Sequence, residues 1–136
     1  MLVRGTTPYH SFTIPMTVDK IVKLYITYFQ NGEIILEKKS DRPEDDVVIT
    51  NFEDMYENAE IDPVTLSEED LGTSIATVHL TEEDTLKFHF YPAAKKNIML
   101  IQLKLLDVDN EVYASEPIKE RVYGVFNEEE LLNKWR

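Results

Sequence analysis

The sequence contains no cysteine, so disulfide bonds, thiolate zinc sites and cysteine nucleophiles are excluded and side-chain packing must hold the fold together. Basic residues are also scarce, since 14 Lys and Arg stand against 26 Asp and Glu, which gives a net charge of −12. Nucleic acids and anionic membranes both attract proteins through Lys and Arg. We therefore expect neither a nucleic acid nor a membrane as a partner.

Long hydrophobic runs are missing as well. No window approaches the roughly 20 apolar residues that cross a bilayer, and no apolar run follows residues 1–7 as it would in a secretion signal. We therefore expect synthesis and folding in the cytoplasm. The 136 residues are 43% hydrophobic and 10% aromatic, which is ordinary for a folded chain with one core.

Most of the negative charge lies in residues 41–72, here called the acidic segment. Its twelve Asp and Glu stand against Arg42 alone, so it carries −11 of the net −12. Apolar side chains are scattered among these acids, namely Phe52, Met55, Tyr56, Ile61, Val64 and Leu66. A purely solvated loop would not need them, so they either fold back onto the body or dock on another chain with a basic surface.

The rest of the chain alternates apolar and polar residues with a period of two, as strands do. This pattern predicts strands at residues 9–14, 20–29, 33–39, 47–50, 74–80, 97–106, 111–115 and 118–125. Asn31-Gly32 predicts a type I′ hairpin turn. Thr81 predicts the N-cap of a short helix in which Leu86 closes one end of the core.

These patterns predict an all-β fold, an antiparallel immunoglobulin-like β-sandwich of seven or eight short strands. The sandwich would occupy residues 1–126 with 41–72 as an acidic loop insertion, and residues 127–136 would form a short C-terminal helix. The Cys…Trp…Cys signature of immunoglobulin domains is absent, so this choice depends on strand number and spacing. A small open barrel is the alternative.

No group of side chains in the sequence indicates chemistry. The histidines His10, His79 and His89 lie on different predicted elements without a second ligand nearby, and acidic pairs such as Glu82 and Glu83 are typical of turns and caps. No calcium-loop spacing occurs among the acids. We predict no catalytic residue, cofactor or metal site, and a protein that is not an enzyme.

The sequence does offer candidates for partner contact. Phe52 and Tyr56 lie in the acidic segment, and Leu131 and Trp135 share one face of the predicted C-terminal helix. Packing of Trp135 on its own domain is the alternative.

Several segments together resemble a known family. They are Arg4-Gly-Thr-Thr-Pro8, Phe12-Thr-Ile-Pro15, Tyr28-Phe-Gln-Asn-Gly32, the stretch Val78–Phe88 with its Leu-Thr-Glu-Glu-Asp-Thr-Leu, Ile101-Gln-Leu-Lys-Leu105 and Ala114-Ser115. This set resembles small structural-module proteins of tailed phages and prophages, which are similar to the N-terminal β-sandwich of phage baseplate upper proteins. The acidic segment and the C-terminal helix are additions to that pattern.

The resemblance implies a non-enzymatic structural adaptor of a tailed-phage virion, located in the tail or baseplate. Its partners would be other phage structural proteins and copies of itself in a symmetric assembly, and the edge strand Tyr9–Ile14 could pair with a neighbour's strand. A head-attached component of the capsid, head fibre or neck is one alternative. A glycan-binding module is another, with Tyr25, Tyr28, Tyr91 and Tyr113 as the aromatic platform.

Overall fold

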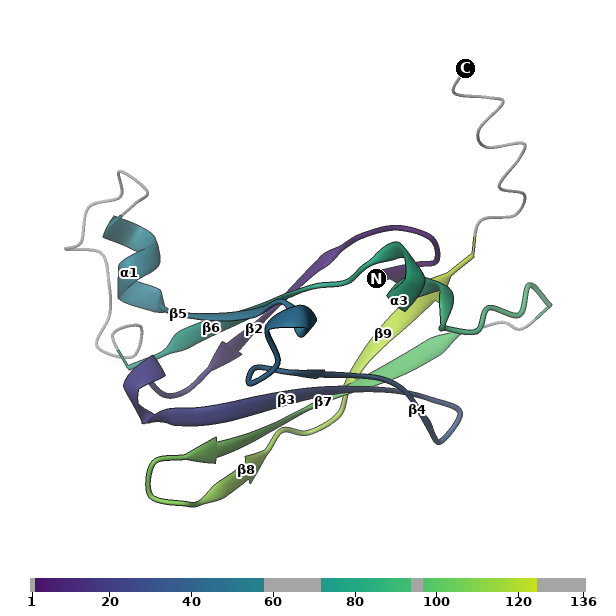
Figure 1. Cartoon of the computed structure of the whole chain (residues 1–136). Helices are drawn as coiled ribbons and strands as arrows, with labels where there is room; N and C mark the ends of the chain where they lie inside the picture. Colours follow the sequence, from purple (N-terminus) through teal and green to yellow (C-terminus); the bar gives the residue numbers. More distant parts are fainter. Residues whose placement is uncertain (1, 58–71, 94–96, 125–136) are drawn as a thin grey trace.

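The computed structural model describes residues 2–57, 72–93 and 97–124. This part of the chain is mostly β and forms two sheets with the hydrophobic core between them (Figure 1). The strands are β1 (Leu2–Val3), β2 (Tyr9–Ile14), β3 (Ile21–Gln30), β4 (Glu33–Lys39), β5 (Val47–Asn51), β6 (Ser74–His79), β7 (Ile98–Asp107), β8 (Val112–Ala114) and β9 (Ile118–Tyr123). The helical elements are η1 (Val18–Lys20), η2 (Pro43–Asp45), α1 (Phe52–Glu57) and α3 (Glu82–Leu86). The all-β prediction and all eight predicted strands are confirmed.

The large sheet has the strand order β1-β9-β7-β3-β4, with β8 also paired to β7. Its centre is the long antiparallel pair β3–β7, in which Leu24 lies opposite Leu105 and Ile26 opposite Leu103. The β3–β4 hairpin turns at Asn31 and Gly32, whose φ angles of 53° and 77° are both positive, as the predicted type I′ turn requires.

The prediction of a wholly antiparallel fold is wrong at one edge of this sheet. β1 runs parallel to β9, with Leu2 opposite Val122 and Val3 opposite Tyr123. This pairing places Leu2 in the core, where it is fully buried beside Val122. A strand of two residues is too short to give a periodic signal, which is why the sequence pattern did not predict β1.

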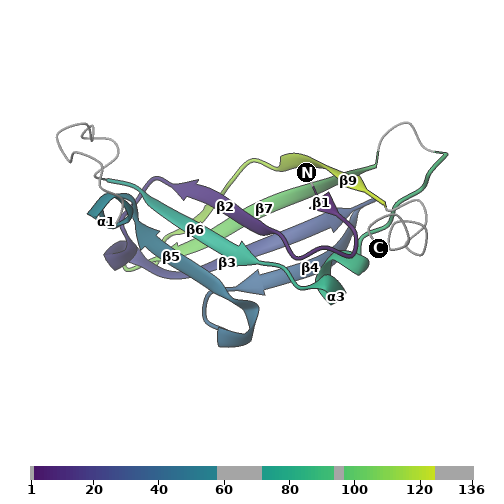
Figure 2. The ribbon, with the colours of Figure 1, turned by 90° about the horizontal axis from the view of Figure 1, so that it is seen from above.

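The small sheet has the order β2-β6-β5 and lies over the large sheet (Figure 2). Its strands read Tyr-His-Ser-Phe-Thr-Ile, Ser-Ile-Ala-Thr-Val-His and Val-Val-Ile-Thr-Asn, without a Lys, Arg, Asp or Glu. Alternate side chains point into the core, among them Ile14, Ala76 and Val78. The two layers also meet through a polar contact, because His10 Nδ1 lies 2.9 Å from the Tyr28 hydroxyl of β3.

The helix α3 begins as predicted but closes the core with a different residue. Thr81 Oγ1 accepts from the Asp84 N–H, and Asp84 Oδ2 accepts from the Thr81 N–H, which completes a capping box. Leu86 is 39% exposed, so the prediction that it closes the core is wrong. Phe88 takes that place at 1% exposure, because the buried side of α3 carries Asp84 and Thr85 and the chain returns to this side at Phe88.

The described part of the acidic segment contains regular structure. It includes η2, the edge strand β5 and then α1, which confirms the strand predicted at residues 47–50. Residues 58–71 and the predicted C-terminal helix at residues 127–136 lie outside the described residues.

Candidate protein-binding edge

The strand β2 is an edge strand, as predicted. It pairs with β6 along all six of its residues, and no strand in the described ranges pairs with its other side. An edge strand presents alternate N–H and C=O groups that a strand from another chain can pair with. Pro8 and Pro15 flank β2 directly, so pairing along this edge is limited to the six residues between them.

This edge lacks the features that usually prevent strand pairing. Natural edges carry inward or central charges, prolines or bulges that discourage a second chain. β2 has none of these, and its register with β6 runs from Tyr9 to Ile14 without a shift. Tyr9 is 68% exposed on the outer face, where its ring stacks on His79 at 4.1 Å between centroids. The result is a regular, uncharged and accessible strand edge.

A groove of about 470 Å³ lies beside the C-terminal half of β2. It is lined by Thr13, Ile14, Pro15, Met16, Leu24, Leu103, Leu105, Tyr113, Ala114 and Ser115, so it spans from β2 of the small sheet to β7 and β8 of the large sheet. Its floor is made of leucines from β3 and β7, and its rim of hydroxyl and small side chains. A strand added to β2 could therefore insert apolar side chains between the two sheets.

In the described part of the chain, the space between the two sheets is open at this half of β2 because of the neighbouring elements. At the N-terminal half the chain crosses from β1 in the large sheet to β2 in the small sheet, and the Pro8 carbonyl accepts from the Leu80 N–H at 2.9 Å. Below the C-terminal half, β8 is only three residues long. The groove thus follows from the strand order and from the shortness of β8.

The polar groups at the groove are neutral. The Tyr113 hydroxyl donates to Glu111 Oε2 at 3.0 Å, and this hydrogen bond raises the pKa of Tyr113 to about 12. Ser115 is held in place by the Leu103 N–H, which donates to its Oγ at 2.9 Å. An uncharged lining favours an apolar or hydroxyl-bearing partner segment over a charged one.

The residues that the sequence predicted as partner contacts are not among those named above as lining this groove. Phe52 is half-buried at the start of α1, directly after β5, which is the small-sheet strand at the edge opposite β2. Tyr56 lies on the same helix, and its side chain is outside the described residues, as are Leu131 and Trp135. The groove itself was not predicted, because it depends on the strand order, which the alternation of apolar and polar residues does not give.

The four tyrosines proposed as a glycan platform do not share a surface. Tyr28 is fully buried in the core. Tyr25 lies opposite Lys104 on the outer face of the large sheet, whereas Tyr113 lies opposite Leu105, whose side chain faces the core. These positions remove the observation on which the glycan alternative depended.

The histidines serve packing in the described structure. Burial lowers the pKa of His10, so its ring is neutral where it contacts Tyr28. His79 lies 3.5 Å from Asp46 and stacks on Tyr9. Within residues 2–57, 72–93 and 97–124, no three His, Asp or Glu side chains are grouped so that they could hold a metal ion.

No helix in the described part of the chain has the length and apolar character needed to cross a membrane. Comparisons with protein-family models, with curated proteins and with solved structures give no match.

Proposed function

We propose that this protein is a non-enzymatic structural adaptor that binds a partner by accepting a strand along β2. The observation that carries the proposal is the coincidence of an uncharged edge strand with an apolar groove of about 470 Å³ directly beside it. In strand addition, main-chain hydrogen bonds give affinity and pockets for alternate side chains give specificity. Both features meet at β2.

We further propose that the fold is an immunoglobulin-like sandwich in which one strand position beside β2 is open. In immunoglobulin domains one sheet has the order A-B-E-D, and the variable type adds C′ to G-F-C in the other. Two observations support this assignment: β2-β6-β5 matches B-E-D, and β9-β7-β3-β4 matches G-F-C-C′. The place of strand A beside β2 then holds no strand of the described chain, because β1 pairs with β9 in the other sheet.

We place this adaptor in the virion of a tailed phage, in the tail or baseplate, with a head-attached position as the alternative. The support is the resemblance of the segments Arg4–Pro8, Val78–Phe88 and Ile101–Leu105 to phage structural modules. Other phage structural proteins would be its partners. Many copies in a symmetric particle would make the contacts multivalent, so that each contact can be weak.

The test compares two lysine substitutions on the small sheet. Thr13 of β2 and Thr50 of β5 both lie opposite Ile75 of the central strand, so they are equivalent positions at the two edges. Tagged wild-type protein, Thr13→Lys and Thr50→Lys are incubated with lysate from phage-producing cells, and captured proteins are identified by mass spectrometry. We expect wild type and Thr50→Lys to recover tail, baseplate or head proteins, and Thr13→Lys to lose them.

A second variant tests the groove separately from the strand edge. Tyr113 lines the groove opposite the core-facing Leu105 and is 45% exposed, so Tyr113→Arg places a charge at the apolar floor without removing a buried group. We expect it to lose the same proteins as Thr13→Lys while keeping the wild-type melting temperature. Equal capture by Thr13→Lys, Tyr113→Arg and Thr50→Lys would refute strand addition at β2, and capture of no virion protein by wild type would refute the phage assignment.

A further inference from the structure

The outer face of the large sheet concentrates basic residues in a strongly acidic protein. Side chains at alternate positions of β3, β4, β7 and β9 point away from the core there, and they include Lys23, Lys39, Lys104, Lys119 and Arg121. These are five of the 14 Lys and Arg in the chain. Glu37 accompanies them on β4 and pairs with Lys39 at 3.2 Å. We call this surface the basic face.

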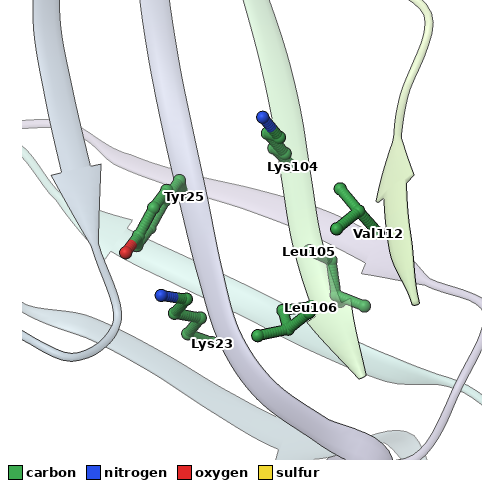
Figure 3. A pocket seen from close by; sticks show the side chains of 6 residues that line it. All are labelled: Lys23, Tyr25, Lys104, Leu105, Leu106 and Val112. Atoms are coloured by element: carbon green, nitrogen blue, oxygen red, sulfur yellow. The ribbon is translucent and has the colours of Figure 1, made fainter. Parts of the chain in front are cut away.

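A shallow pocket of about 270 Å³ lies at the centre of the basic face (Figure 3). The ring of Tyr25 is contacted by two amines, with Lys23 Nζ 5.3 Å and Lys39 Nζ 5.1 Å from its centroid. Lys104 lies opposite Tyr25 on β7. The floor is apolar and its outward-facing side chains are Leu106 and Val112, which lie opposite each other on β7 and β8.

Lys23 and Lys104, which line the pocket, can bind an anionic group of a partner. Among the residues that the structure describes, no carboxylate forms an ion pair with Lys23 or Lys104. The packing of Lys23 on Tyr25 holds one amine in a fixed position, which lowers the entropy cost of binding an anion. The lysines can pair with carboxylates, and the apolar floor between them can contact apolar side chains. The pocket therefore favours a segment in which carboxylates alternate with apolar residues.

The chain itself contains a segment of that composition. The acidic segment carries a charge of −11, and its acids are interspersed with Met55, Ile61, Val64 and Leu66. Its described part includes Glu53 and Asp54, which are exposed on α1. α1 lies on the side of the small sheet, away from the basic face of the same copy (Figure 1).

We propose that the basic face binds the acidic segment of a second copy of this chain. The charges of the two surfaces are opposite, and the rest of the chain has almost no net charge that would oppose their approach. The inference rests on the proposed adaptor function, and it names a second copy as one partner of that adaptor at a surface distinct from β2.

The contact is heterologous, because two different surfaces of the chain meet. Heterologous contacts form closed rings when the rotation closes and open filaments when it does not. The pocket is small and its cations are exposed to solvent, so a single contact is weak and strongly salt-dependent. Repetition around a ring would supply the missing affinity.

Sedimentation equilibrium of the purified full chain tests this contact. The screening length falls from about 30 Å at 10 mM salt to about 3 Å at 1 M, so we expect association at low salt and monomers at high salt. In Lys23→Glu/Lys104→Glu and in Glu53→Lys/Asp54→Lys, we expect the association constant to fall by about tenfold or more. The control is Lys87→Glu, an exposed lysine at the end of α3 and away from the basic face.

Charge swapping separates a direct contact from a general charge effect. An equimolar mixture of the two double variants should associate again, because each variant carries the surface that matches the other: the reversed face meets the reversed segment, and the unchanged segment meets the unchanged face. Circular dichroism confirms that each variant remains folded. A monomeric wild type at low salt, association that the Lys23→Glu/Lys104→Glu variant leaves unchanged, or a mixture that stays dissociated would each overturn the proposal.

The experiment uses only this chain, so its outcome is independent of the capture experiment with Thr13→Lys. Loss of self-association with intact capture of virion proteins would refute the second copy as a partner and leave the adaptor function standing. Intact self-association without capture would do the reverse.

Discussion

Replacing Lys38 should destabilise the protein far more than replacing its neighbour Lys39. Lys38 Nζ lies 2.7 Å from Asp84 Oδ2, and the two side chains are only 7% and 10% exposed. This ion pair joins β4 of the large sheet to α3, where Asp84 also completes the capping box. Removing one partner of a buried pair typically costs about 3–5 kcal/mol, because the other charge remains buried without compensation.

For Lys38→Met we expect the lower end of that range, about 3 kcal/mol, because the Thr81 N–H still donates to Asp84 at 3.0 Å. In a domain of this size the loss corresponds to about 10 °C in Tm. Lys39→Met is the matched control: Lys39 pairs with Glu37 at 3.2 Å near the surface, and we expect a loss of at most about 1 kcal/mol. Urea unfolding followed by circular dichroism measures both differences.

The pH dependence identifies the source of the loss. Burial by itself would raise the pKa of Asp84, but the hydrogen bonds from Lys38 and Thr81 outweigh it, and the pKa is lowered. Because the folded pKa lies below the unfolded value of about 3.9, this stabilisation is complete above that pH and is lost as pH falls through the folded pKa. In Lys38→Met the pKa of Asp84 is higher than in wild type because Lys38 no longer lowers it, so Asp84 is protonated first in the variant. The gap between wild type and Lys38→Met should therefore shrink as pH falls through the folded pKa of the variant toward that of wild type.

An additional variant removes the buried charge. Asp84→Asn keeps an oxygen that can accept from the Thr81 N–H, so the double variant Lys38→Met/Asp84→Asn should regain more than half of the stability lost in Lys38→Met. If Lys38→Met loses no more than Lys39→Met, or if the gap stays constant down to pH 3, the ion pair is not what Lys38 contributes.

Three further substitutions test the fold. Thr81→Ala removes the oxygen that accepts from the Asp84 N–H at 3.1 Å and should cost about 1 kcal/mol in urea unfolding, while Thr81→Ser should retain wild-type stability. Burial lowers the pKa of His10 in the folded protein, so as pH falls His10 is protonated in the unfolded state before it is protonated in the folded state. The free energy of unfolding should therefore decline as pH falls below about 6.5, and His10→Gln should lack this decline. In Gly124→Ala the new Cβ would lie 2.3 Å from Phe90 Cδ1, so the free energy of unfolding should fall by about 1–3 kcal/mol. If the same substitution costs as much in a Phe90→Ala background, the contact with Phe90 is not the cause.

The sequence predicted the elements whose signals are local. Alternation predicted β3 and β7, the Asn31-Gly32 pair predicted the turn into β4, the hairpin partner of β3, and Thr81 predicted the start of α3. In each case the deciding interaction lies within a few residues of the signal, so tertiary packing had little opportunity to override it.

The features that were missed depend on contacts between distant residues. Leu86 was expected in the core, but Asp84 takes the inner side of α3 because Lys38, 46 residues earlier, supplies its counter-ion. β1 is a strand only because β9 lies beside it. The groove at β2 likewise appears only when strand order is known, since it lies between β2 and the distant strands β7 and β8.

The distribution of charge separates two kinds of surface on this small fold. The small sheet has no Lys, Arg, Asp or Glu in its strands, so its open edge at β2 is suited to main-chain pairing and apolar insertion, which salt affects little. The basic face and the acidic segment carry opposite charges, so a contact between them weakens as salt rises. Two contacts with different salt dependence can be made and broken independently. If both proposed contacts form, each copy binds a partner protein through β2, and neighbouring copies bind each other through the basic face and the acidic segment. High salt would then dissociate the copies from one another at a lower concentration than it dissociates a copy from the partner protein.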